Sequence, residues 1–144
     1  MPFAVLPVME ITEALDFVRA NSHAVLTTTR RDGTPQMSPV TVGVDDAGRV
    51  VISTRQTAAK TKNLIRDPRA WLVVLNPQFY GSWVYLNGAA EIVDLPEALP
   101  LLEEYYRSLS GEHPDWDDYR AAMIRDQRCL IRITPTAVGP SVAG

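Results

Sequence analysis

The sequence is poor in the residues that build covalent or metal-held sites: its 144 residues include one cysteine, two histidines and two lysines. A single cysteine excludes an intrachain disulfide and a cysteine-cluster metal site. Cys129 lies in RCLIRIT, where apolar residues alternate with arginines. This alternation predicts a buried core thiol rather than a reactive one.

Other common signatures are also missing. The stretch MPFAVLPVMEI has no basic lead-in and no long apolar run, so we expect neither a signal peptide nor a membrane span, and a cytoplasmic location. No H-E-x-x-H or G-x-S-x-G motif occurs, which argues against the usual zinc and serine hydrolases. The acidic run Asp115, Asp117 and Asp118 fits the start of a helix better than a metal site. We therefore predict no metal.

Charge is unevenly distributed along the chain. The net charge of −3 argues against a nucleic-acid binder, since such domains are usually basic. Residues 19–69 nevertheless carry nine cations and four acids, whereas residues 91–118 carry nine acids and one cation. This asymmetry can focus a positive field on one site. A small anionic ligand fits it better than a long polyanion does.

The hydrophobic patterns predict a mostly β protein. Apolar spacing predicts helices over 9–20 and 57–66, one from Pro96 to just before Gly111, and one capped by Asp115. Residues rich in β-branched side chains, broken by RRDGTP and DDAG, predict a three-stranded meander. Three later strands follow, with a bulge or corner at Gly88. Together these predict one domain, a small six-stranded antiparallel barrel with flanking helices, and an irregular tail over 135–144.

Both lysines lie in one short stretch, RQTAAKTKNL, at the start of the helix predicted over 57–66. At about 100° per residue, Lys60 lies about 40° from Leu64 and about 160° from Lys62. Lys60 should therefore face the barrel, whereas Lys62 and Arg66 should face solvent. A helix N-terminus binds anions, and Ala58 and Ala59 would let a phosphate approach the backbone. A simple solvated basic helix explains the composition equally well.

No acid–base machinery can be recognised. His23 precedes an apolar strand and fits a surface position, and His113 fits a turn between helices. The catalytic residues are therefore unknown. An anion site without catalytic carboxylates or histidines is typical of proteins in which a bound cofactor supplies the chemistry.

Four stretches carry a resemblance to a known family: AVLTTTRRDGTPQMSPV, VVISTRQTAAKTKNLIRDPRAWLVV, GSWVYLNGAAEIV and GEHPDWDDYRAAMIRDQRCLIRI. Over residues 10–134 the chain resembles the flavin and deazaflavin oxidoreductases of the split β-barrel fold, often called pyridoxine-phosphate-oxidase-like. It is most similar to the actinobacterial branch that uses the deazaflavin coenzyme F420. The resemblance implies a homodimer with the cofactor at the subunit interface.

The resemblance also implies a set of cofactor-binding residues. Arg55, Ala58, Ala59 and Lys60 correspond to the phosphate site, and Ser53 and Thr54 before them are also expected to bind the cofactor. The strand beside the cofactor ring corresponds to Gln36, Met37 and Ser38. Trp83 corresponds to a position that contacts the cofactor from the neighbouring subunit.

The implied function is an F420H2-dependent reductase that transfers hydride to an electron-poor unsaturated small molecule. Solvent or a tyrosine such as Tyr85 would supply the proton. Two alternatives stay open: an FMN-dependent enzyme of the pyridoxamine-phosphate type, and an F420 carrier without turnover. F420 carries a phosphodiester and an oligoglutamate tail, so it suits a broad basic groove such as Arg30, Arg31, Arg49, Arg55 and the lysines could form.

Overall fold

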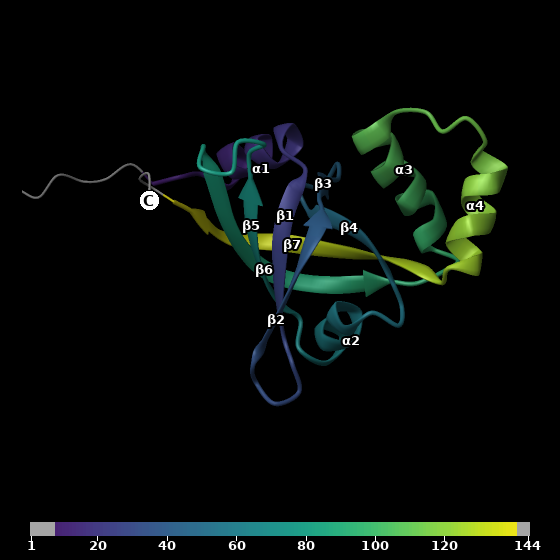
Figure 1. The fold of residues 1–144 in the computed structure, drawn as a ribbon, viewed down its shortest axis with the longest axis horizontal. Coiled ribbons are helices and arrows are strands. Elements are labelled where there is room, and N and C mark those ends of the chain that lie inside the picture. Colours follow the sequence, from purple (N-terminus) through teal and green to yellow (C-terminus); the bar gives the residue numbers. More distant parts are fainter. Residues whose placement is uncertain (1–7, 141–144) are drawn as a thin grey trace, which may run out of the picture.

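The computed structural model describes residues 8–140. Figure 1 shows a strongly curled antiparallel sheet with helices around it. In chain order the elements are α1 (Ile11–Ala20), β1 (His23–Thr29), β2 (Pro35–Thr41), β3 (Gly43–Val44), β4 (Val50–Arg55), α2 (Ala59–Arg66), β5 (Arg69–Leu75), β6 (Trp83–Val93), α3 (Ala98–Ser110), α4 (Trp116–Arg125) and β7 (Arg128–Gly139). The architecture is the expected split β-barrel, mainly β with flanking helices.

The sheet has the strand order β2-β1-β5-β6-β7-β4-β3. Its two edge strands, β2 and β3, are consecutive in the chain and separated only by Val42, which is fully buried. One continuous segment therefore supplies both edges, and this curls the sheet into a half-closed barrel. The sequence predicts this segment as one strand and the barrel as six-stranded. The structure has seven strands because the chain turns inward at Val42, where its N–H donates to the carbonyl of Ser22.

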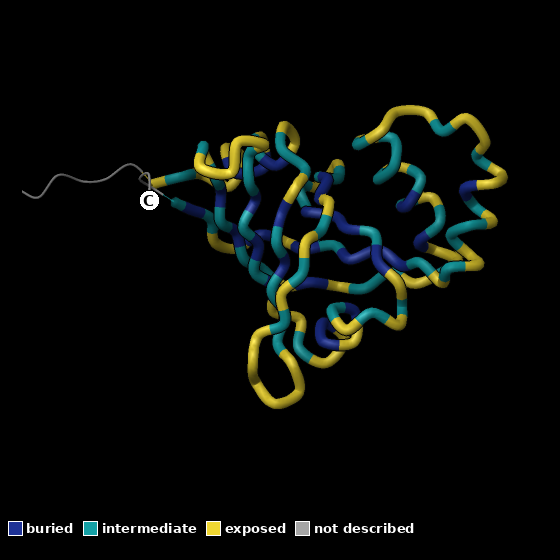
Figure 2. Tube along the Cα trace, viewed as in Figure 1, coloured by how far each residue is buried: buried dark blue, intermediate teal, exposed yellow. Residues whose placement is uncertain are grey.

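The core fills the inside of the curl. In β1 buried and half-exposed residues alternate, so Ala24, Leu26 and Thr28 face inward. Figure 2 shows buried segments recurring along the strands, whereas the hairpin between β1 and β2 is exposed. Burial of these apolar side chains is the main force that holds the barrel together.

The last strand is longer than the sequence predicts. β7 continues to Gly139, and residues 135–139 pair with residues 85–88 of β6. The expected irregular tail over 135–144 is thus wrong for its first five residues, because β6 offers them an unpaired edge. Residues 141–144 of that expected tail lie outside the described part of the chain.

Gly88 marks an irregularity in the β6–β7 pairing, as predicted. The register shifts between Asn87 and Gly88. A Cβ atom at Gly88 would lie 1.9 Å from the carbonyl oxygen of Thr134, so only glycine fits between the two strands. The bulge allows β6 to bend around the core.

Three helices position the site. α2 begins at Ala59, two residues later than predicted, because the N–H of Ala58 closes a turn onto the carbonyl of Arg55. The α3–α4 pair stands to one side of the barrel in Figure 1 and packs on β4 and β7 through Ala98, Leu102 and Tyr119. Asp115 caps α4 as predicted, accepting from the N–H of Asp118 at 3.1 Å. Within residues 8–140 no helix has the length and apolarity needed to cross a membrane.

Candidate functional site

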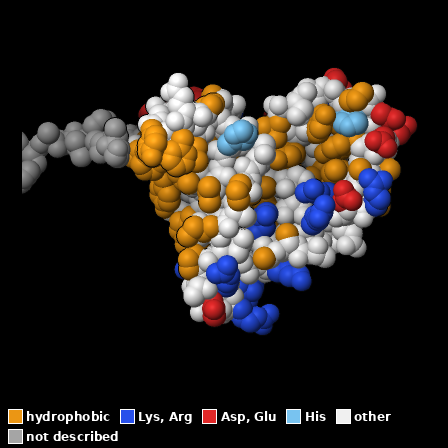
Figure 3. All heavy atoms as spheres, viewed as in Figure 1, with side chains coloured by type: hydrophobic (Ala, Val, Ile, Leu, Met, Phe, Trp, Pro, Cys, Tyr) orange, Lys and Arg blue, Asp and Glu red, His pale blue; other side chains and the backbone are white. Residues whose placement is uncertain are grey.

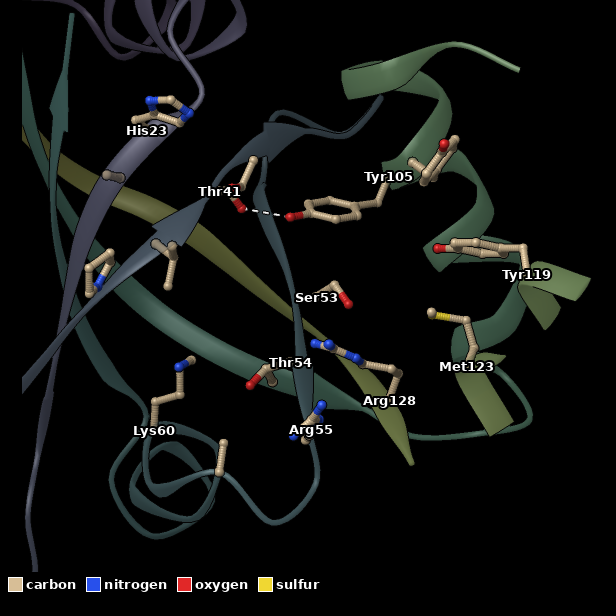
Figure 4. Close-up of a pocket in the computed structure, with 15 residues that line it drawn as sticks. His23, Thr41, Ser53, Thr54, Arg55, Lys60, Tyr105, Tyr119, Met123 and Arg128 are labelled. Carbon is tan, nitrogen blue, oxygen red and sulfur yellow. Dashed lines mark hydrogen bonds between the residues drawn. The ribbon is translucent and has the colours of Figure 1, made fainter. Parts of the chain in front are cut away.

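A cavity of about 800 Å³ separates the barrel from the α3–α4 pair. This volume is within the range of small-molecule and cofactor sites. The barrel contributes His23, Ala24, Pro39, Val40, Thr41, Ser53, Thr54 and Arg55; the start of α2 contributes Ala58 and Lys60; α3 and α4 contribute Tyr105, Tyr106, Tyr119 and Met123; and β7 contributes Arg128. Figure 4 shows these side chains around the open space.

The cavity is positively charged. Among residues 8–140 its lining contains Arg55, Lys60 and Arg128, and no aspartate or glutamate. Figure 3 shows a hollow between the barrel and the helical pair, with Lys and Arg side chains toward its lower side. Three cations in a partly enclosed space without a carboxylate strongly favour an anionic ligand.

Lys60 and Lys62 differ in environment as the helical phase predicts. Lys60 is half-buried, and its Nζ donates to Ser38 Oγ at 3.3 Å, whereas Lys62 is exposed. Ala58 precedes α2 in an extended conformation, and within the described chain no side chain caps this helix end. The first N–H groups of α2 and the Lys60 ammonium therefore lie at the same end of the cavity.

A buried polar network fixes α2 against the barrel. Asn63 donates to Thr28 Oγ1 at 3.1 Å, and Thr28 donates to Gln36 Oε1 at 3.1 Å. Thr61 Oγ1 donates to the carbonyl of Arg55 at 2.7 Å. Thr28 and Thr61 are fully buried, so these bonds form in a dry environment where they strongly restrain the geometry. They hold Lys60 at a fixed place relative to β2 and β4.

Arg55 and Arg128 are directly opposite each other in the antiparallel β4–β7 pair. Directly opposed residues project from the same face of the sheet, and both of these line the cavity. The Nε of Arg128 is buried and has no hydrogen-bond partner among residues 8–140. In Figure 4 its guanidinium group points into the cavity near Ser53.

An aromatic wall closes the helical side of the cavity. Tyr105 donates its hydroxyl to the carbonyl of Thr41 at 2.8 Å, which ties α3 to β2. Tyr119 donates to the carbonyl of Leu102 at 2.8 Å. Burial raises the pKa of Tyr105 and raises that of Tyr119 to about 12. Both phenols are thus neutral and engaged with backbone, so they offer ring surface rather than a ready acid or base.

The expected cofactor residues fall into two groups. Ser53, Thr54, Arg55, Ala58 and Lys60 line the cavity, and Ser38 reaches it through Lys60. The others do not line it: Gln36 belongs to the buried network, Met37 is 62% exposed, Ala59 is exposed, and Trp83 lies on β6 away from it. Tyr85, the suggested proton donor, also lies on β6 and does not line the cavity.

Sequence reasoning missed part of the lining: His23, Tyr105, Tyr119, Met123 and Arg128. His23 was assigned to the surface; it is exposed and also lines the cavity. Arg128 appeared only as the polar neighbour of Cys129. Its alternation with Cys129 was the available signal, because a residue next to a buried strand position must face the opposite side of the sheet.

Comparison with known proteins places the fold in a wider group. A crystal structure of the conserved hypothetical protein Rv2991 from Mycobacterium tuberculosis is 26% identical over 96% of this chain and 88% of that one, with a TM-score of 0.74. A structure named F420 Reductase is 23% identical over 83% of this chain and 90% of that one, with a TM-score of 0.63. A structure of a heme binding protein from Mycobacterium smegmatis is 21% identical over 95% of this chain and 54% of that one, with a TM-score of 0.65.

The family comparison covers nearly the whole described chain. The model of the pyridoxamine 5'-phosphate oxidase family matches residues 11–140, from the start of α1 to the end of β7 and one residue beyond. This range includes every element that lines the cavity. The chain therefore belongs to the pyridoxamine 5'-phosphate oxidase family.

Proposed function

We propose that this protein is an F420-dependent reductase, which binds the reduced deazaflavin in the cavity and passes hydride to an electron-poor unsaturated small molecule. The observation that carries the proposal is the meeting of Lys60, Arg55 and the start of α2 in a cavity where no described residue supplies a carboxylate or caps the helix. A half-buried cation that has no acidic partner among the described residues favours a ligand anion. A phosphate at this end would meet both a charge and free N–H groups.

The residues of the site suit such a coenzyme. Lys60, Arg55 and the backbone at Ala58 would hold the phosphate, and the strand from Gln36 to Ser38 would lie beside the ring. The bound coenzyme supplies the hydride. The protein's share is to orient the two reactants and exclude water, and positioning alone can account for several kcal/mol of a barrier. The aromatic wall of Tyr105 and Tyr119 supports this by giving a flat acceptor a surface to pack against.

Two considerations favour F420 over FMN. One similar fold bears the name F420 Reductase. The cations also extend from Lys60 through Arg55 to Arg128 along the cavity, which suits a ligand with several negative groups better than one with a single terminal phosphate. FMN remains the alternative, for an enzyme of the pyridoxamine-phosphate type.

Titration of the purified protein with F420, FMN and haem tests the proposal. We expect F420 to bind with a dissociation constant of micromolar or below, followed by absorbance and fluorescence, and FMN to bind much more weakly. Haem is included because one similar structure is a heme binding protein and His23 lines the cavity. Tightly bound FMN or haem in freshly isolated protein would contradict the assignment.

A homodimer with the coenzyme at the subunit interface completes the proposal. Its support is the outer face of β5 and β6, where Trp71, Val73, Trp83 and Tyr85 are only half-buried in the single chain. Apolar side chains of this size seldom stay open to water over a contiguous area. Analytical ultracentrifugation should give a mass twice that of one chain, whose mass is 16.0 kDa. A monomer at micromolar concentration would refute the interface.

A carrier without turnover is the second candidate, because the hydroxyls of Tyr105 and Tyr119 in the cavity wall are both bonded to backbone carbonyls. Steady-state assays with reduced F420 and a panel of quinones, enones and tetrapyrroles distinguish the two. The reductase requires at least one acceptor to oxidise the bound coenzyme faster than the free coenzyme. The carrier predicts that none does so.

A further inference from the structure

Arg55 and Arg128 place two positive charges directly opposite each other in the β4–β7 pair. Like charges directly opposite one another on a sheet destabilise it. Other arginines on or beside this sheet are ion-paired: Arg49, just before β4, bonds Asp45 at 2.8 Å, and Arg132 on β7 bonds Glu91. The Arg55–Arg128 pair has no such acid among residues 8–140. An external anion would relieve the repulsion.

The environment of Arg128 restricts how that anion can be held. Its Nε is buried without a partner among the described residues, and its guanidinium group points into the cavity. A guanidinium group stays charged at all ordinary pH values and presents a planar fork of donors that matches a carboxylate. Buried donors of this kind are normally satisfied, so a bound group is the natural partner.

Arg128 and Lys60 are at different places in the cavity. Lys60 stands on α2 and bonds Ser38 on β2, whereas Arg128 stands on β7 beside the wall formed by Tyr105, Tyr119 and Met123. In Figure 4 the two side chains lie on opposite sides of Thr54. A single phosphate at Lys60 and the start of α2 therefore leaves Arg128 without a partner.

We propose that Arg128, opposite Arg55, anchors a second anion subsite, which takes a carboxylate of a bound ligand beside the rings of Tyr105 and Tyr119. This deepens the proposed function, on which it rests for the phosphate at Lys60. The carboxylate belongs to an unsaturated acid that accepts hydride or to the glutamate tail of the coenzyme. Both sources present the same chemistry to Arg128.

Ligand-observed NMR with trans-cinnamate and its neutral amide, cinnamamide, tests the subsite directly. Cinnamate should bind more tightly than the amide, and Arg128→Gln should weaken cinnamate on the order of 10- to 100-fold, the usual effect of losing a charge-assisted hydrogen bond. Arg132→Gln is the matched control, since Arg132 is on the same strand, does not line this cavity and should change binding less than about twofold. The proposal is overturned if cinnamate and cinnamamide bind equally well. It is also overturned if Arg128→Gln weakens neither the binding of cinnamate nor the binding of F420.

A second arm identifies the source of the carboxylate. If the coenzyme tail occupies the subsite, the loss of F420 affinity in Arg128→Gln should grow with the number of glutamates, and cinnamate should compete with the tail. If the acceptor occupies it, cinnamate should bind to the F420-loaded protein, and Arg128→Gln should leave F420 affinity nearly unchanged. FMN, which has a phosphate and no carboxylate, should change by less than about threefold in either case.

Two further results separate the subsite from other causes. Without ligand, the melting temperature of Arg128→Gln should equal or exceed that of the parent, since the substitution removes a like-charge pair. A large fall in melting temperature together with weaker FMN binding would indicate that Arg128 has a structural role and would overturn the proposal. Arg128→Lys keeps the charge and loses the fork, so it should recover only part of the cinnamate affinity. The parent protein could bind cinnamate through Arg128 and yet fail to bind F420. In that case the proposed function fails and the carboxylate subsite stands.

Discussion

Lys60 on α2 donates to Ser38 on β2 at 3.3 Å, which joins the short helix after β4 to the edge strand of the sheet. The two residues are 22 positions apart in the chain. Their contact places Lys60, which is half-buried, beside the N-terminus of α2 on the wall of the cavity of about 800 Å³. A neutral hydroxyl does not neutralise an ammonium group, so this charge remains available to a ligand.

The first prediction contrasts the two lysines. Lys60→Ala should weaken F420 binding at least tenfold, because the ligand phosphate loses a charge-assisted bond worth about 1.5–3 kcal/mol. Lys62→Ala should change F420 affinity less than about twofold, because the attraction between an exposed cation and a ligand acts across water and is screened by salt. Fluorescence titration at fixed ionic strength measures both. Equal losses would refute the assignment of Lys60 to the cavity and Lys62 to solvent.

The second prediction concerns the bulge at Gly88. Gly88→Ala would place a Cβ atom 1.9 Å from the backbone oxygen of Thr134, so β6 and β7 must separate. The free energy of unfolding should fall by about 1–3 kcal/mol, measured by urea denaturation. Gly33→Ala is the contrast: its Cβ would meet open space, and only its φ of +87° opposes the change. It should cost about 1 kcal/mol. A neutral Gly88→Ala would show that the strands can shift freely.

The third prediction concerns Cys129, which is fully buried in β7. Burial raises the pKa of its thiol to about 11. At pH 8 a disulfide reagent such as Ellman's should therefore react with the folded protein on the order of 100-fold or more slowly than with the urea-unfolded chain, because only the thiolate attacks. Cys129→Ala should give no colour in either state. Rapid labelling of the native protein would show that the thiol is accessible.

The fourth prediction is an alkaline loss of stability. The pKa of Tyr119 is raised from its ordinary value of 10.0 to about 12 by burial, so the folded state keeps the phenol neutral where the unfolded chain loses the proton. The stabilisation that Tyr119 gives through this pKa difference is complete below about pH 10. The free energy of unfolding should therefore fall as pH rises from about 10 to about 12.

Denaturation of Tyr119→Phe tests this assignment. The variant should show a smaller slope between pH 10 and 12, and a loss of about 1 kcal/mol at pH 8 from the missing bond to Leu102. Both chains should carry Cys129→Ala, because the thiol also titrates in the alkaline range. Identical slopes in the two chains would place the titrating group elsewhere.

Sequence patterns predicted the local features that depend on neighbouring residues. The Asp115 cap, the Gly88 irregularity and the separation of Lys60 from Lys62 all follow from spacing within a few residues. The resemblance to the family supplied the split barrel, which composition alone could not have specified. Two strand limits differ from the prediction: the strand expected after Asp32–Gly33 divides at Val42, and β7 extends to Gly139.

The sequence by itself determined that a helix with one inward lysine near its start follows β4, because helical phase is a local property. Only the tertiary structure decided which other residues line the cavity with that lysine. Tyr105 and Tyr119 reach the cavity because α3 and α4 pack on β4 and β7, and Arg128 opposes Arg55 because β4 and β7 pair in one particular register. These contacts join residues up to about half the chain apart, and no local period encodes them.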